Sequence, residues 1–361
     1  MSGRLQPLLD RVARNGRARN ALLAPAIAVG LATFVFCALL ISAGKPPIGT
    51  MLAILNGAFG SRLSILETLT RATPLLLCAL AVAVPARAGM FNIGGEGQLH
   101  AGAIAATAVA LCSAHLPGLF VIPVMIGAGM LAGAAWGAVP GVLRARLGVN
   151  EVLVSLMLNY VAIFLVEYLV HGPWKDPSAL GWPYSAQFPP SAVLPTWGRS
   201  NVHLGLLIGL VLAVAAFVLM RTTTWGFAVR VVDANPAAAR YAGIRTARYI
   251  TVLMLIGGAM AAIAGVGEVS VIQGRLRSGI SPGYGYTGFV VSWLAGNNFL
   301  AIIPVAVLIG GLYAGSDAIQ LSASLPSSTG DIFMGLVFLA FLFSNAIADK
   351  LRSVGAAGTV R

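Results

Sequence analysis

The residues best suited to recognising a solute lie in the segment Phe91-Asn92-Ile93-Gly94-Gly95-Glu96-Gly97-Gln98. It holds one carboxylate, two carboxamides and three glycines between two long apolar runs. Polar and ionisable groups at membrane depth are costly and mark functional sites by default. Glycine interruptions in apolar segments point to binding sites made from broken helices. The segment therefore suggests a transported solute rather than a catalysed reaction, and we expect neither catalytic residues nor metal ligands.

Two roles are open for each of these polar side chains. Glu96 could accept hydrogen bonds from a solute, or it could cap the exposed amides of a broken helix, where an anion is favourable. Asn92 and Gln98 can both donate and accept, which suits a neutral polar solute. Amides also hold membrane helices together.

Further polar and aromatic side chains could join this site. Asn159 lies two helical turns beyond Glu151 on nearly the same face, so it could line a pathway or lock two helices. Aromatic faces can stack on any nucleobase. The predicted substrate pathway comprises Phe91, Asn92, Glu96, Gln98, Asn159, Tyr284 and Tyr286. For Glu268 we expect an ion pair with Arg275 or Arg277.

The composition indicates an integral membrane protein. Of 361 residues, 58% are hydrophobic and only 9% are charged, whereas a soluble domain carries roughly 25% charged residues. The net charge of +12 resides mostly in short loops. Such a distribution is what membrane topology requires, and we do not interpret it as nucleic-acid binding.

The apolar runs predict an all-α polytopic fold of about ten transmembrane helices. Basic residues cluster in alternate loops, which places both termini in the cytoplasm of a bacterial inner membrane. We expect cytoplasmic tails at 1–20 and 349–361 and a transmembrane domain at 21–348. The segment 284–296 is too short for an ordinary span, so broken helices are predicted near 91–98 and 281–288. The ten predicted segments are 21–43, 66–86, 92–114, 119–143, 151–170, 203–220, 249–272, 284–296, 299–316 and 331–347.

A short internal similarity suggests an inverted repeat of five helices plus five. Arg87-Ala88-Gly89-Met90 and Arg277-Ser278-Gly279-Ile280 both precede a glycine-rich turn and an apolar helix, at an offset of 190 residues. In the predicted topology the two motifs lie on opposite sides of the membrane. Inverted repeats are a common transporter plan, with the binding site near the midplane.

Two loops and one helix face could carry contacts. The external loop 171–202 is rich in Pro and Trp and could cover the outer mouth or receive a partner. In the internal loop 221–248, Asn235-Pro236 predicts the start of a short helix that Gly243 closes. This helix suits docking on a soluble partner better than adsorption to anionic lipid. A ladder of glycines every fourth residue permits close helix packing, either within the subunit or against a second one: Gly129, Gly133, Gly137 and Gly141.

Three segments together resemble a known family: 91–103, 225–244, and Gly148-Val149-Asn150-Glu151-Val152-Leu153 with Leu156-Met157-Leu158-Asn159-Tyr160. They resemble the permease subunits of ATP-binding-cassette importers for nucleosides and simple sugars, a ribose-permease-like group of the branched-chain amino acid permease superfamily. The similarity covers roughly residues 20–350. One departure is Gly95, where many relatives carry Ala.

The resemblance implies a division of labour among subunits. The permease would form the pathway, with a second, paralogous permease beside it. A cytoplasmic ATPase with two fused cassettes would bind ATP and Mg, so this chain needs no cofactor. Substrate would come from a periplasmic or lipoprotein solute-binding protein. The loop would couple to the ATPase through Asp233, Asn235, Pro236, Ala239, Arg240, Tyr241 and Gly243.

The chain contains no G-x-x-x-x-G-K-[ST] sequence, so it cannot bind ATP through that motif. Any ATP that is used must be bound by a partner. The alternative function is a proton-coupled secondary transporter of a small polar solute, in which Glu96 or Glu268 carries the proton.

Overall fold

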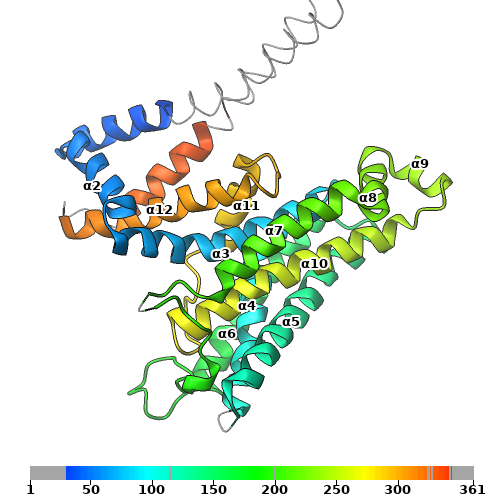
Figure 1. Ribbon diagram of the computed structural model, residues 1–361, viewed down its shortest axis with the longest axis horizontal. Coiled ribbons are helices and arrows are strands. Elements are labelled where there is room, and N and C mark those ends of the chain that lie inside the picture. Colours follow the sequence, from blue (N-terminus) through cyan, green and yellow to red (C-terminus); the bar gives the residue numbers. More distant parts are fainter. Residues whose placement is uncertain are drawn as a thin grey trace, which may run out of the picture. The chain divides into compact units, whose positions relative to one another are not determined.

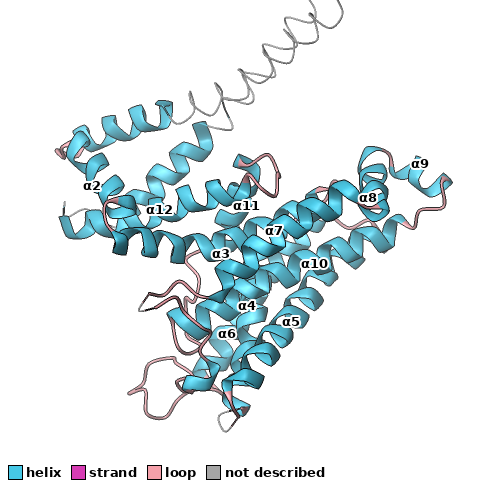
Figure 2. Ribbon diagram, in the orientation of Figure 1, coloured by secondary structure: helices cyan, strands magenta, loops and turns pink. Residues whose placement is uncertain are grey.

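The computed structural model describes residues 30–113, 116–198, 200–322, 326, 328–340 and 343. Within these residues the regular structure is helical, with isolated β-bridges in place of strands (Figure 2). The predicted tails at 1–20 and 349–361 lie outside the described residues. The all-α expectation is confirmed.

The chain divides into two compact units, Met1–Gly57 with Leu312–Arg361, and Ala58–Gly311. The first unit contains the helices Gly30–Ser42 and Ser328–Ala340, most of α2 (Pro47–Phe59) and the second half of α12 (Ile302–Ser322). Within it, the rings of Phe36 and Phe333 lie 4.6 Å apart. Helix α2 is an addition to the sequence-based prediction, which placed no element at 47–59.

The second unit contains the remaining helices (Figure 1). Their bounds are α3 Arg62–Ala86, α4 Gly95–Cys112, α5 Gly118–Leu147, α6 Glu151–His171, α7 Leu204–Thr222, α8 Thr224–Ala234, α9 Pro236–Tyr241, α10 Thr246–Gly267 and α11 Tyr284–Leu294. A π-helical turn, Glu268–Ile272, extends α10. The first half of α12 completes the unit.

The helices coincide with the predicted membrane segments. Six helices of the described residues are long and apolar enough to cross a membrane: α3, α5, α6, α7, α12, and α10 with its π-helical extension. The shorter α4 and α11, with Gly30–Ser42 and Ser328–Ala340, match the other four predicted segments. Helix α11 has only 11 residues, as the short run at 284–296 predicted.

Helix α10 forms the centre of the second unit because its small residues allow three neighbours to approach closely. Gly258 lies against the Gly133 backbone of α5, Gly257 against Ala81 of α3, and Gly265 against Leu99 of α4. The glycine ladder of α5 faces Met254, Gly258, Ala262 and Val266 of α10. The ladder therefore serves packing within the subunit, the first of the two roles considered for it.

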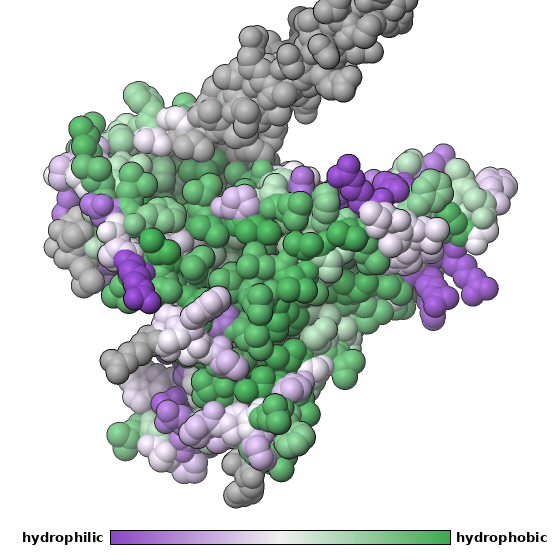
Figure 3. Space-filling model, in the orientation of Figure 1, coloured by the Kyte–Doolittle hydropathy of each residue, from purple (hydrophilic) through white to green (hydrophobic). Residues whose placement is uncertain are grey.

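The outward face of α7 is apolar, as a membrane requires. Leu207, Val211, Val214 and Val218 are each about half exposed. Figure 3 shows hydrophobic residues over this part of the second unit and hydrophilic ones gathered around α8 and α9. The apolar surface is consistent with lipid as its solvent.

The loop between α6 and α7 folds back onto the segment that follows α10. The amides of Ser185 and Phe188 donate to the carbonyls of Leu276 and Gly274 at 2.9 Å, and the Leu194 amide donates to Ser270 Oγ. The Arg275 guanidinium lies over the Tyr184 ring, 5.1 Å from its centroid. This loop is thus held by its own subunit on the side opposite α8 and α9 (Figure 1).

Helices α8 and α9 form a capped pair at the other end of α7 and α10 (Figure 1). Thr223 Oγ1 accepts from the Gly226 amide and starts α8. Asn235 Oδ1 accepts from the amides of Ala237 and Ala238, and Pro236 takes the first helical position. Gly243 follows with a φ of +77°. The prediction of a short helix between Asn235 and Gly243 is confirmed.

Candidate translocation site

Two half-helices begin inside the second unit, and their N-termini meet. The Glu96 carboxylate at the start of α4 accepts from the Gly285 amide of α11, with 2.8 Å between Oε2 and nitrogen. The backbones of Gly95 and Gly285 touch at this point. Ser281 Oγ accepts from the next α11 amide, that of Tyr284, at 2.9 Å. Glu96 therefore caps a broken helix, but that helix is α11 rather than its own.

The two half-helices begin at positions that the predicted repeat would make equivalent. Gly95 and Gly285 are 190 residues apart, the same offset as Arg87 and Arg277. Helix α4 follows α3 yet packs on α10, and α11 follows α10 yet packs on α3. In an inverted repeat, a residue that touches the equivalent residue of the other half would lie at the pseudo-twofold axis. Transporters of this kind place their binding sites at that interface.

The N-terminus of α4 is also capped by side chains. Asn92 Oδ1 accepts from the Gly94 amide at 3.2 Å, and Asn92 exchanges two hydrogen bonds with Gln98, at 2.9 and 3.0 Å. The Asn92 amide further donates to the Ala81 carbonyl at 3.0 Å. Both side chains are buried. These contacts favour the helix-locking role for the amide pair.

Asn159 joins α6 to the same turn. Its Oδ1 accepts from the Gly97 amide at 2.8 Å, and its Nδ2 donates to the Ile93 carbonyl at 2.9 Å. The Tyr286 hydroxyl lies near this amide. The indole nitrogen of Trp136, close to Gly97, is buried and has no partner among the described residues. Trp136 was not among the predicted site residues.

The three predicted aromatic side chains differ in their surroundings. Tyr284 is buried and accepts from Arg71 at 3.3 Å. Tyr286 is half-buried beside Asn159. Phe91 is 45% exposed and lies 6.4 Å from the Trp293 ring. Tyr286 and Phe91 therefore keep accessible aromatic surface near the half-helix crossing.

Glu268 is buried where α10 becomes a π-helix. Such bulges are frequent at functional sites. The charges that act on Glu268 are those of Arg71, Glu67 and Glu96. Arg275 instead packs on Tyr184, and Arg277 has a buried Nε that lacks a hydrogen-bond partner among the described residues. The expected pair of Glu268 with one of these two arginines is therefore not found within the described residues.

The predicted coupling residues separate into exposed and anchored groups. On α9, Tyr241 is 95% exposed and Arg240 is exposed, whereas Ala239 is buried. On α8, Asp233 approaches the Gly89 backbone and exerts its charge on Arg87. Burial lowers the pKa of Arg87, and the Asp233 carboxylate opposes that shift. The Asp233 side chain thus lies beside the segment that leads into α4.

Arg87 also contacts the end of the other half-helix. Its Nη2 donates to the Asn297 carbonyl at 2.7 Å, and its guanidinium lies 4.8 Å from the Phe299 ring centroid. One arginine therefore joins the entry to α4 with the exit from α11 and also feels the charge of Asp233 on α8.

The fold and this site define a polytopic helical membrane protein whose buried polar groups converge on two half-helices, an arrangement typical of solute transporters. The family model for the branched-chain amino acid transport system / permease component matches residues 64–342. The chain belongs to this family of transport permeases.

Three curated relatives of this chain are also transport permeases. A glucose ABC transporter permease protein of Haloferax volcanii is 37% identical and covers 81% of this chain and 79% of its own length. A guanosine ABC transporter permease protein of Bacillus subtilis is 32% identical, with coverages of 93% and 98%. A nucleoside ABC transporter permease protein of Lactococcus lactis subsp. cremoris is 31% identical, with coverages of 90% and 91%.

Proposed function

We propose that this chain forms the translocation pathway for a nucleoside or simple sugar in an ABC importer. The relatives' names support this solute class, since one refers to glucose and two to nucleosides. The observation that best supports this proposal is the hydrogen bond between Glu96 and Gly285, which brings the N-termini of two half-helices together at a buried polar site. Solute would pass beside this point, next to Tyr286, Phe91 and the unpartnered Trp136 indole.

The proposed complex contains partners that supply energy and substrate. A separate ATPase subunit with two fused cassettes would bind ATP and Mg, a second, paralogous permease would complete the pathway, and a periplasmic or lipoprotein binding protein would deliver solute. We place the chain in a bacterial cytoplasmic membrane with both termini inside. The basic residues of α9 and its flanking loops would then lie on the cytoplasmic side.

In this proposal, a short route would lead from the ATPase to the pathway. Movement of α9 would displace α8, because Asn235 ends one helix and starts the other. Asp233 would carry that displacement to Arg87, whose contacts reach the entry to α4 and the exit from α11. Both half-helices would respond together.

The test is ATP hydrolysis by the full complex in lipid, with a solute-loaded binding protein. Arg240→Ala with Tyr241→Ala removes two exposed α9 side chains without disturbing packing. We expect stimulated hydrolysis to fall about tenfold or more, because interface hot spots, which are enriched in Tyr and Arg, cost about 2 kcal/mol or more when truncated. The control is Arg146→Ala, which removes an exposed basic residue at the end of α5. Equal stimulation in both variants would refute coupling through α9.

A further inference from the structure

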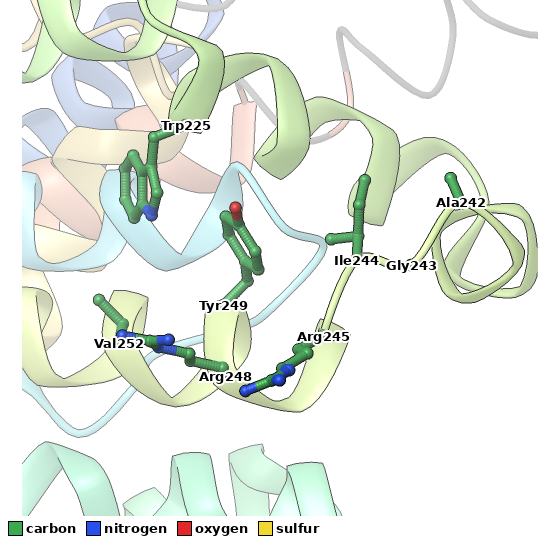
Figure 4. A pocket seen from close by; sticks show the side chains of 8 residues that line it. All are labelled: Trp225, Ala242, Gly243, Ile244, Arg245, Arg248, Tyr249 and Val252. Atoms are coloured by element: carbon green, nitrogen blue, oxygen red, sulfur yellow. The ribbon is translucent and has the colours of Figure 1, made fainter.

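A cavity lies at the base of α9, outside the translocation site. It measures about 550 Å³ and is bounded by α8, the turn after α9 and the start of α10. Figure 4 shows Trp225 and Tyr249 next to each other, with Arg245 and Arg248 on α10. The ring centroids are 6.1 Å apart and the ring planes are inclined by 27°. Both rings are half-buried and line the cavity together.

The charge in this cavity is uncompensated. Arg245 and Arg248 are three residues apart at the start of α10, so they share one helix face and repel each other. The first turn of α10 contains no acidic residue, and cations there oppose the helix dipole. Among the described residues, neither arginine takes part in an ion pair. An anion bound between them would relieve both repulsions.

The chemistry of the cavity fits a phosphate group as that anion. Guanidinium groups bind phosphate through paired N–H donors, and two of them can share one phosphate. The cavity also has an apolar side, formed by Ile244 and Val252. A ligand with a phosphate head and an apolar body would satisfy both sides.

The position of the cavity relative to the membrane indicates where such a ligand would come from. The cavity lies where α7 has ended at Thr222 and the membrane-spanning part of α10 begins at Thr246. Trp and Tyr are enriched at this depth of a bilayer. Nearby on α8, Phe227 is 60% exposed, which suits lipid better than water. Basic pockets between membrane helices on the cytoplasmic side bind anionic lipid headgroups.

We propose that this cavity binds the phosphate headgroup of an anionic phospholipid, with Arg245 and Arg248 on the phosphate and Trp225 and Tyr249 beside the glycerol region. The bound lipid would stiffen the junction between α8 and α10. Because the site is separate from the solute pathway, this assignment does not depend on which solute is carried.

The test is titration of the delipidated full-length protein with phosphatidylglycerol, measured as bound lipid by native mass spectrometry. Each arginine that contacts the bound phosphate should contribute about fivefold to the affinity, so Arg245→Gln with Arg248→Gln should weaken binding about thirtyfold. The matched control is Arg146→Gln with Arg221→Gln, which removes the same charge from the ends of α5 and α7. The control should change affinity less than threefold. Both pairs are exposed, and circular dichroism checks that both variants fold.

Three results would overturn the assignment. Equal weakening in both double variants would indicate general surface charge rather than a site. Inorganic phosphate or ADP that displaces phosphatidylglycerol at comparable concentration would identify a soluble phosphate as the ligand. Unchanged lipid binding with lost ATPase association in the Arg245 and Arg248 variant would assign the cavity to the partner protein.

Discussion

Replacing Gly285 by alanine should disrupt the half-helix crossing, whereas the same change at Gly95 should be tolerated. A Cβ at Gly285 would overlap the Glu96 amide nitrogen and lie 2.5 Å from Glu96 Cα. Both are backbone atoms held by two packed helices, so no side-chain rotation relieves the clash. A Cβ at Gly95 would meet the Gly285 backbone at 3.4 Å, an ordinary contact. The two glycines therefore form a matched pair on one interface.

The expected cost follows from the geometry. Restoring a 3.4 Å contact at Gly285 requires the two N-termini to separate by about 1 Å. That displacement would stretch the 2.8 Å bond from the Gly285 amide to Glu96 beyond hydrogen-bonding range. Overpacking costs about 1–3 kcal/mol, and a lost hydrogen bond to a charged group about 1.5–3 kcal/mol. Together they predict a loss of about 3–5 kcal/mol for Gly285→Ala, against less than about 1 kcal/mol for Gly95→Ala.

Thermal unfolding in detergent, followed by fluorescence-detected size exclusion, would measure the difference. For a domain of this size, 1 kcal/mol shifts the apparent Tm by about 2–4 °C. Gly285→Ala should therefore lower the Tm by about 10 °C and Gly95→Ala by less than about 4 °C. Equal Tm values for the two variants would refute the close backbone approach on which the site rests.

Three further predictions concern other contacts. Gly133→Ala should cost about 1–3 kcal/mol, because its Cβ would overlap the Gly258 carbonyl, while Gly127→Ala on the same helix meets open space and should not lower the Tm. Glu96→Gln should retain most uptake, since its amide oxygen can still accept from the Gly285 amide, whereas Glu96→Leu should abolish it; an inactive Gln variant would revive the proton-carrier alternative. Hydrogen bonds from Ser178 lower the pKa of Asp176 in the folded protein. Their contribution to the stability of the outer loop is therefore present above about pH 4, and it is lost as the pH falls through the lowered pKa of the folded state. The protection factor of the Ser178 amide, which corrects for the intrinsic pH dependence of exchange, should fall below that pH, and a protection factor that does not change with pH would contradict this.

The sequence was sufficient where one local signal determines an element. Apolar run length located the spans, and Asn235-Pro236 with Gly243 located α9. Helix α2 gave no such signal, because Pro47–Phe59 is shorter than a span and follows the first span after only a short turn. Helix α8 is a short amphipathic segment inside a basic loop, where charge obscured its periodicity.

Long-range pairings were harder to predict. Glu96 was recognised as a possible helix cap, but its donor at Gly285 is 189 residues away. The 190-residue offset could have paired Gly95 with Gly285, because equivalent residues meet at a twofold axis. Glu268 was misassigned to arginines nearby in sequence, since Arg71 reaches it only through the packing of α3 against α10.

The most direct test of the central claim is uptake of labelled guanosine and glucose by proteoliposomes that contain the full complex and a matching binding protein. We predict that uptake of one of these solutes requires ATP inside the cytoplasmic compartment, persists when a protonophore collapses the proton gradient, and stops when Arg240 and Tyr241 are replaced by alanine. Uptake by this chain alone, driven by a proton gradient without ATP, would contradict the account.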